Sequence, residues 1–431
     1  MIALRFRGPL SALSVDDRRA LFDRSSSTDA TVNAAVASII ADVRMRGDRA
    51  LRELAARFDP AVPEHLEVPR DVRRRALDAI DPALRRAMQR SADNIAAVQG
   101  ASLPKSVVCN PEPGISICRR PDPLSCVGVY APGGRAAYPS SVLMGAVPAR
   151  IAGVGEVVLC SPPSASGAPS DIVLAAAELA EVDRVFAIGG AGAIAAMALG
   201  TDTVPRVDRI VGPGNAYVTA AKLQLVGSVA IDSPAGPSEL VVIADRTSSP
   251  DVIAFEMLAQ AEHDPLACVL ALCIGKDVAR AVDEALSRLV EQQARASIIR
   301  FALRGQGGVL AVHSVDEAID AANSYAPEHL LVAITDAEGI VDRIRGAGTI
   351  LIGETASVAF GDYMTGANHV LPTNGLARSY SGLSVLDFIR WTTCQRLDAT
   401  AARSLSSDTV AFAMAEGLPG HALAAQQWSV E

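Results

Sequence analysis

Hydrophobic positions follow one repeating pattern along most of the chain. From residue 123 onwards, short β-branched runs alternate with helical stretches, starting with a strand at 125–130 and reaching a strand at 229–231. The alternation restarts with a strand at 240–244 and continues to 349–352. Strands that alternate with helices form βαβ units and parallel sheets. The pattern predicts an α/β fold with two similar doubly wound, incomplete Rossmann-like domains.

The segments outside these two runs differ in character. Residues 29–58 and 71–97 carry apolar positions at helical spacing, so we expect a helical N-terminal region. The end of the chain is expected to be helical, beginning with a helix at 385–395. We expect four parts: an N-terminal arm at 1–24, a first α/β domain from 25–124 and 236–380, a second α/β domain at 125–235, and a C-terminal helical tail at 381–431.

Composition narrows the class of protein. A chain of 431 residues is too long for one core, which agrees with two or more domains. The net charge of -9 without a basic block argues against nucleic acid as a partner. The chain contains no run of about 18 apolar residues, so no membrane span is predicted. The first residues lack the apolar stretch of a signal peptide. Seven cysteines without a Cys-x-x-Cys pair are expected to be reduced and mostly buried in a cytoplasmic protein.

The strongest candidate for chemistry is the sequence Ala-Pro-Glu-His-Leu at 326–330. Pro327 ends the preceding helix, and Glu328 and His329 enter the next strand. Adjacent strand residues point to opposite faces, so only an irregular turn lets both side chains face one pocket. In one pocket they would form an acid/base couple.

The same tetrapeptide occurs at 63–66, which provides an internal comparison. Nothing around Glu64 and His65 resembles a site, so we expect a turn with a solvated carboxylate and a half-buried imidazole. Pro-Glu-His-Leu alone is therefore not specific, and the second copy depends on the residues near it.

Three further residues carry metal-binding chemistry. Gln260 and His263 are three apart near the end of a helix and share a face. Together with Asp362 they offer nitrogen and oxygen donors suited to zinc or a similar divalent ion. On spacing alone, a capping or core histidine is the better interpretation of His263, and glutamine is an uncommon ligand.

Other candidates lie in the loop after Asp362 and near the C-terminus. His369 is a candidate substrate contact, with an Asx turn as the alternative interpretation of its loop. Glu416 and His421 flank a Gly-Leu-Pro-Gly sequence, with a helix C-cap and surface tail as the alternative. A role in a site requires that this tail dock on another domain or on a partner chain.

Glycine-rich turns point to a nucleotide. Tyr130 to Gly134 follows a strand, and the Gly-Pro-Gly-Asn sequence ending at Asn215 opens a helix, where an anion binds well. Gly-Ala-Gly-Ala-Ile-Ala at 190–195 fits a dinucleotide fingerprint, with Asp208 at the spacing of a ribose contact. This match is short in a chain rich in glycine and alanine.

Several motifs together resemble the histidinol dehydrogenase family over nearly the whole chain and in the right order. They are Gln-Ala-Glu-His (260–263), Tyr-Ala-Pro-Glu-His-Leu (325–330), Gly-Asp-Tyr (361–363), Asn-His-Val-Leu-Pro-Thr (368–373), the segment 416–421, Gly-Pro-Gly-Asn-Ala (212–216) and Asp-Ser-Pro-Ala-Gly-Pro-Ser-Glu (232–239).

The resemblance implies a reaction and its cofactors. The family oxidises L-histidinol through a held aldehyde, histidinal, to L-histidine in two NAD-linked steps, the last reaction of histidine biosynthesis. By similarity, one zinc ion per subunit is bound by Gln260, His263 and Asp362, with His421 supplied by the other subunit of a homodimer. The first domain would then hold zinc and substrate, and the second would bind NAD.

The resemblance also assigns roles to single residues. His329 is expected to act as the base on the alcohol and Glu328 to activate water for attack on the aldehyde. The expected substrate contacts are Ser238, Gln260, His263, Glu328, His329, Asp362, His369, Glu416 and His421, and the expected NAD contacts are at Tyr130, Gly192 and Asn215.

One position departs from the family pattern. Gly192 stands where the family usually has a glutamine at an NAD contact. Loss of one neutral hydrogen bond, about 0.5–1.5 kcal/mol, predicts weaker NAD binding.

Two alternatives differ from this hypothesis. One is a paralogue with the same zinc and NAD machinery that acts on another small polar alcohol. The other is a non-catalytic zinc- or nucleotide-binding regulator. The retained His369, Glu416 and His421 favour histidinol, and the intact Glu328 and His329 argue against a regulator.

Overall fold

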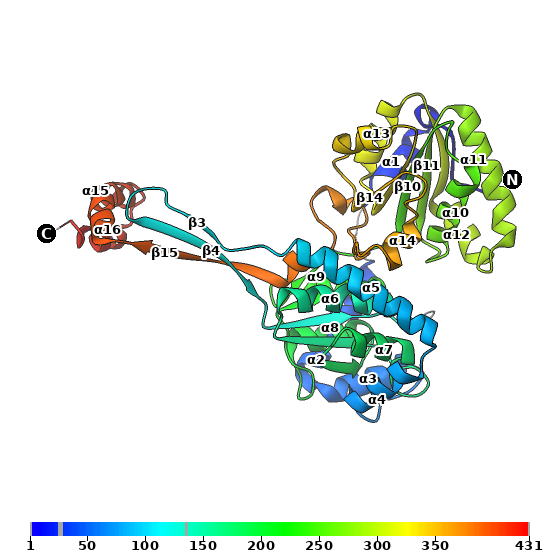
Figure 1. Ribbon diagram of the computed structural model, residues 1–431. Helices are drawn as coiled ribbons and strands as arrows, with labels where there is room; N and C mark the ends of the chain where they lie inside the picture. The colour runs from blue at the N-terminus through cyan, green and yellow to red at the C-terminus, as the bar shows by residue number, and fades with distance from the viewer. Residues whose placement is uncertain (1, 25–28, 134–136, 430–431) are drawn as a thin grey trace.

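The computed structural model shows two α/β units and a long projecting arm (Figure 1). The structure describes residues 2–24, 29–133 and 137–429, so Gly134 of the first glycine-rich turn lies outside the described residues. Each unit contains a six-stranded sheet that is wholly or mostly parallel. The predicted fold class, two α/β domains with parallel sheets, is confirmed.

The first unit is built on a sheet whose strands are all parallel. In sheet order these strands are β1 (Phe6–Pro9), β12 (Gly307–Val312), β11 (Cys268–Ile274), β10 (Glu239–Ala244), β13 (His329–Ala333) and β14 (Thr349–Ile352). Successive residues of β10 point to opposite faces, so Val242 joins one buried cluster and Val241 the other. Both faces are therefore covered, as parallel sheets require.

The helices of the first unit divide between these two faces. One cluster includes apolar side chains of α10 (Pro250–Ala261), α11 (Lys276–Leu289) and α12 (Ala296–Gln306), with the short α14 (Val358–Tyr363) at its edge. The other includes side chains of α1 (Val15–Phe22), α13 (Val315–Tyr325) and the 3-10 segment Glu338–Arg343. Ser249 accepts a hydrogen bond from the Val252 N–H and Pro250 occupies the first turn of α10, as the sequence predicted.

The second unit repeats this plan. Its strands in sheet order are β2 (Glu67–Val68), β7 (Arg184–Ala187), β6 (Glu156–Ser161), β5 (Cys126–Tyr130), β8 (Arg209–Val211) and β9 (Ala230–Ile231), with β2 antiparallel to β7. One buried cluster includes side chains of α4 (Arg70–Ala79), α5 (Pro82–Ala101), α6 (Pro139–Ala152) and α7 (Asp171–Leu179). The opposite cluster includes side chains of α2 (Ala30–Arg46), α3 (Asp48–Phe58), α8 (Gly190–Leu199) and α9 (Ala216–Leu225).

The contacts correct the expected grouping of segments into domains. Helices α2 to α5 were expected to join residues 236–380, but they cover the second sheet, where Val36 and Ile95 are fully buried. Residues 1–24 are not a free arm, because β1 extends the first sheet through the pairing of Phe6 with Gly308. An amphipathic helix buries its apolar face on either sheet equally well, so the pattern alone did not distinguish them.

The projecting arm consists of three strands and two terminal helices. The antiparallel strands β3 (Val107–Cys109), β4 (Ile115–Pro123) and β15 (Ile389–Leu397) form a separate sheet. Helices α15 (Ala399–Ala415) and α16 (Pro419–Gln426) pack on each other at its tip, away from both units (Figure 1). The predicted helix at 385–395 is wrong, because this segment is a 3-10 turn followed by β15, which pairs with β4 along its whole length.

Two expectations from composition can be compared with the structure. No helix among the described residues is long and apolar enough to cross a lipid bilayer. All seven cysteines are free, but only Cys160 and Cys273 are buried, so the expectation of mostly buried thiols is wrong.

Candidate active site

The candidate site lies at the amino-terminal edge of the first sheet. Strands β10 and β13 start side by side here, with Leu240 paired to His329. Helix α13 ends at Tyr325. Its C-cap residue Ala326 is fully buried and has a φ of 51°, a left-handed conformation that is uncommon for alanine. Pro327 follows, and both Glu328 and His329 then turn inward, with exposures of 7% and 4%. The irregular turn that the sequence required is therefore present.

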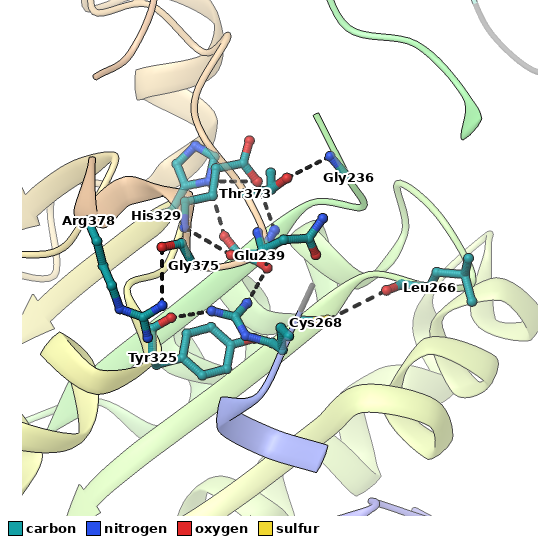
Figure 2. A network of polar contacts seen from close by, with 12 residues as sticks. Gly236, Glu239, Leu266, Cys268, Tyr325, His329, Thr373, Gly375 and Arg378 are labelled. Carbon is teal, nitrogen blue, oxygen red and sulfur yellow. Dashed lines mark hydrogen bonds and ion pairs between the residues drawn. The ribbon is translucent and has the colours of Figure 1, made fainter. Parts of the chain in front are cut away.

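Glu328 is held by its neighbour on β10, Glu239. The Glu328 carboxylate accepts a hydrogen bond from the Glu239 N–H at 2.8 Å, and the Glu328 N–H donates to the Glu239 carboxylate at 3.3 Å. Figure 2 shows Glu239 at the centre of the polar network beside His329. This reciprocal pair fixes the position of the Glu328 carboxylate.

His329 lies between carboxylates. Its Nδ1 is 3.2 Å from the Glu239 carbonyl oxygen and 3.6 Å from Glu328 Oε2, and its Nε2 is 3.5 Å from Asp362 Oδ1. Burial acts to lower the pKa of His329, but Glu328 and Asp362 outweigh it and raise the pKa to about 10. With Nδ1–H donating to the carbonyl, Nε2 is the nitrogen that faces the site.

Asp362, on α14, brings further candidates together. Burial acts to raise the pKa of this carboxyl, but His329, His369 and His263 nearby hold it below the usual range. The Asp362 carbonyl oxygen is 2.9 Å from His369 Nδ1, and burial lowers the pKa of His369. Gln260 is the penultimate residue of α10, and its carbonyl accepts from the His263 N–H at 3.4 Å.

These residues offer donors for a metal ion, but an incomplete set within one chain. Gln260 is only 2% exposed, yet its side-chain amide makes no hydrogen bond to any described residue. An imidazole, a carboxylate and a free amide oxygen suit zinc chemically. In the ranges that the structure covers, no group of three or more His, Cys, Asp or Glu side chains is arranged to hold a metal.

Ser238 and the segment 364–374 complete this edge of the sheet. Ser238 is half-buried directly before β10, where its carbonyl accepts from the Cys268 N–H. Asn368 donates to the Met144 carbonyl at 2.8 Å, and Asn94 donates to the Met364 carbonyl at 2.6 Å. Both contacts reach helices of the second unit, so the site lies at the junction of the two units.

The expected NAD residues gather at the carboxyl edge of the second sheet. The Tyr130 hydroxyl accepts from the Gly190 N–H at 3.0 Å, at the start of the helix that contains Gly192. Asn215 caps α9 by accepting from the backbone of that helix. This edge, at helix N-termini, is the usual location for a dinucleotide in such sheets.

Asp208 does not act as the fingerprint match predicted. Its carboxylate accepts from the N–H groups of Ser125 and Cys126, at 3.0 and 3.1 Å, before strand β5. It therefore lies at the amino edge of the sheet, opposite the glycine-rich turns.

Glu416 and His421 lie elsewhere in the chain. Both are exposed on the helical tip of the projecting arm, away from Glu328 and His329 (Figure 1). The same tip exposes Phe412, Leu423 and Trp428. Within one chain the structure does not bring these two residues to the site.

The Pro-Glu-His-Leu sequence at 63–66 lies in different surroundings from the copy that contains Glu328 and His329. The side chains of Glu64 and His65 are 92% and 75% exposed, so the carboxylate is solvated as expected and the imidazole is more exposed than expected. Identical local sequence thus gives a buried pair only where the surrounding sheet supplies partners.

Sequence reasoning assigned no role to Glu239 or Arg24. Glu239 is fully buried and pairs with the Arg24 guanidinium, from the end of the N-terminal segment. Burial raises the pKa of Glu239 to about 7, even though Arg24 opposes this. A carboxylate at the start of the otherwise apolar strand Leu-Val-Val-Ile-Ala was the available signal.

Comparison with known proteins covers almost the whole chain. The family model for histidinol dehydrogenase matches residues 22–428. The histidinol dehydrogenase of Methanosarcina mazei is 42% identical over 423 residues, covering 98% of this chain and 97% of the relative. That of Halobacterium salinarum is 47% identical over 411 residues, covering 95% and 96%. The crystal structure of the enzyme from Elizabethkingia anophelis superimposes with a TM-score of 0.94 at 33% identity, covering 99% of this chain and 98% of that one.

Proposed function

The chain belongs to the histidinol dehydrogenase family of NAD-dependent enzymes that oxidise an alcohol and then an aldehyde, and we propose that Glu328 and His329 carry both oxidations of L-histidinol here. The observation that supports this most is their joint burial beside Asp362, at an edge that also holds Gln260, His263 and His369.

His329 acts as the general base on the alcohol. Its Nδ1 faces the Glu239 carbonyl, so Nε2 receives the hydroxyl proton when the substrate loses hydride. Asp362 cannot fully ligate a cation and also stabilise a proton on His329. If Asp362 ligated a cation, it would stabilise a proton on His329 less, and the His329 pKa would fall from about 10 towards the range in which a base works.

Glu328 serves the second oxidation. Its carboxylate already accepts from the Glu239 N–H, which orients it, and its remaining lone pairs can accept a proton from the water molecule that attacks the aldehyde. Adjacent residues thus perform the two proton transfers while the substrate stays in place.

Zinc and NAD supply what the side chains lack. Gln260, His263 and Asp362 would hold zinc together with the partner subunit's His421, and a bound zinc ion would supply a Lewis acid that anchors the substrate amine and imidazole. NAD would accept hydride from its position by Tyr130, Gly192 and Asn215.

A homodimer accounts for the arm. Its tip carries exposed apolar side chains as well as Glu416 and His421, and a surface of this kind is suited to a protein partner. We place Glu416, with Ser238 and His369, among the substrate contacts of the shared site.

A turnover assay tests this function. With histidinol as substrate, about two NADH per molecule consumed are expected, because two carbon-centred oxidations each remove one hydride. A chelator should stop turnover and added zinc should restore it. Turnover of other small alcohols but not of histidinol would favour a paralogue, and full activity after chelation would remove zinc from the mechanism.

A further inference from the structure

One residue with a fully buried side chain, Glu239, contacts both proposed catalytic residues, one through its carboxylate and the other through its main chain. Glu239 begins β10, and its side chain meets only donors: the Arg24 guanidinium, the Asn374 N–H at 2.9 Å and the Glu328 N–H at 3.3 Å. An ionised carboxylate accepts through both oxygens, whereas an amide of the same shape would point an NH2 group at a donor. The surroundings therefore select a carboxylate chemically.

The main chain of Glu239 makes two further contacts. Its N–H donates to the Glu328 carboxylate at 2.8 Å, and its carbonyl oxygen is 3.2 Å from His329 Nδ1. One residue thus holds the backbone of Glu328, the carboxylate of Glu328 and the ring of His329.

Arg24 supports this arrangement from the N-terminal segment. Besides pairing with Glu239, its guanidinium donates to the Tyr325 carbonyl and lies over the Tyr325 ring, 3.4 Å from the centroid. Tyr325 is the last residue of α13, directly before the Ala326–Pro327 turn. Arg24 and Glu239 therefore hold the two ends of the segment that carries the catalytic pair.

The same carboxylate reaches the segment of His369. Asn374 donates its backbone N–H to Glu239. Thr373 Oγ1 accepts from the Gly236 N–H at 2.6 Å (Figure 2). These contacts join the loop before β10 to the loop that carries the third histidine.

We propose that Glu239 is a positioning residue for both oxidation steps, which orients Glu328 and His329 through its side chain and main chain, with Arg24 as its buried counter-ion. This inference rests on the proposed roles of Glu328 and His329. In E239Q the main-chain contacts persist, but the amide has only one oxygen. The Glu328 N–H therefore either loses its acceptor or shares that oxygen with Arg24 and Asn374.

Kinetics of E239Q test the proposal. We expect kcat to fall about 100-fold, the effect of a displacement on the order of 1 Å, with KM for histidinol and NAD little changed. Oxidation of histidinal supplied directly should lose more than the alcohol step, because His329 keeps its carbonyl contact. Wild-type kcat in folded E239Q, or a change in KM alone, would overturn the proposal.

Two controls separate positioning from stability. R7M removes a partly buried ion pair with Asp283, from the same N-terminal segment but outside the site, and should change stability without changing kcat. If E239Q does not fold, R24A replaces it: added guanidinium ion should restore its kcat, and failure to restore kcat in folded R24A would overturn the proposal.

A fourth variant, E328Q, separates a failure of the proposed function from a failure of the positioning role. E328Q should lose histidinal oxidation under the proposed function. If E328Q stays active, the proposed function itself fails. If E328Q is inactive and E239Q is fully active, only the positioning role of Glu239 is wrong.

Discussion

Replacement of Lys222 by methionine should destabilise the second unit and weaken NAD binding at the carboxyl edge of its sheet, where we propose the NAD site. Lys222 and Asp232 form an ion pair in which both side chains are almost fully buried. Lys222 Nζ also donates to the Gly212 carbonyl at 2.9 Å, and the Gly212 N–H donates to Asp232 at 2.7 Å. The pair thus clamps both sides of Gly212, which has a φ of 116° and opens the turn that ends at Asn215.

The magnitude follows from burial. Met fills a volume similar to that of Lys, but it leaves the Asp232 charge without a counter-ion in a site where burial already raises the pKa of that carboxyl. Breaking a buried pair in this way costs about 3–5 kcal/mol. K222M/D232N should recover much of that loss, because a neutral amide still offers an oxygen to the Gly212 N–H.

Urea unfolding followed by circular dichroism measures the change in unfolding free energy, and NAD titration measures the change in NAD affinity. The exposed pair Arg280–Asp277 provides the control: R280M should change the unfolding free energy by at most about 1 kcal/mol. If K222M costs no more than R280M and binds NAD normally, the clamp has no energetic role and the reasoning fails.

Three shorter predictions concern single residues. H329N should lower kcat for alcohol oxidation about 100- to 10,000-fold, whereas H65N, in the exposed copy of the same tetrapeptide, should match wild type. G192Q should bind NAD about 2- to 10-fold more tightly in a fluorescence titration, once the tip of Leu54, 3.0 Å from the new Cβ, moves aside; unchanged affinity would exclude the missing hydrogen bond. Burial raises the pKa of Asp59 from 3.8 to about 6, so the folded protein binds this proton more tightly than the unfolded chain does. This contribution to stability is complete below pH 3.8 and is lost as pH rises through 6. Because Asp59 is only half-buried and water screens its charge, D59N should be about 1–2 kcal/mol more stable than wild type in urea above pH 6, less than the full shift implies, and equal to it at low pH. Equal stability throughout would contradict the shift.

Local patterns predicted the two parallel sheets well, because each strand and helix of a βαβ unit has its own hydrophobic periodicity. The turn at Ala326–Pro327 was also readable, since proline restricts the residue before it. What the pattern did not contain was the choice between two similar sheets for helices α2 to α5. That choice depends on shape at the packed interface, which one sequence does not reveal.

Long-range partners explain the other errors. Strand β15 was predicted as the end of a helix, because its pairing partner β4 lies about 270 residues earlier in the chain and only the pair makes an extended conformation favourable. Glu239 lies in the motif at 232–239, but no role was predicted for it, because its partners Arg24 and Asn374 are distant in sequence. The positions of the site residues on the first sheet followed from their strands, but their mutual contacts did not.

Shared sites between subunits can be tested by co-expressing H329N and H421N chains with different tags and purifying the mixed dimer. If each site uses its own His329 and the partner subunit's His421, the mixed dimer has one intact site and should show about half of wild-type activity, although each parent dimer is inactive. If His421 served its own chain, both sites of the mixed dimer would be defective. An inactive mixed dimer would therefore contradict the account.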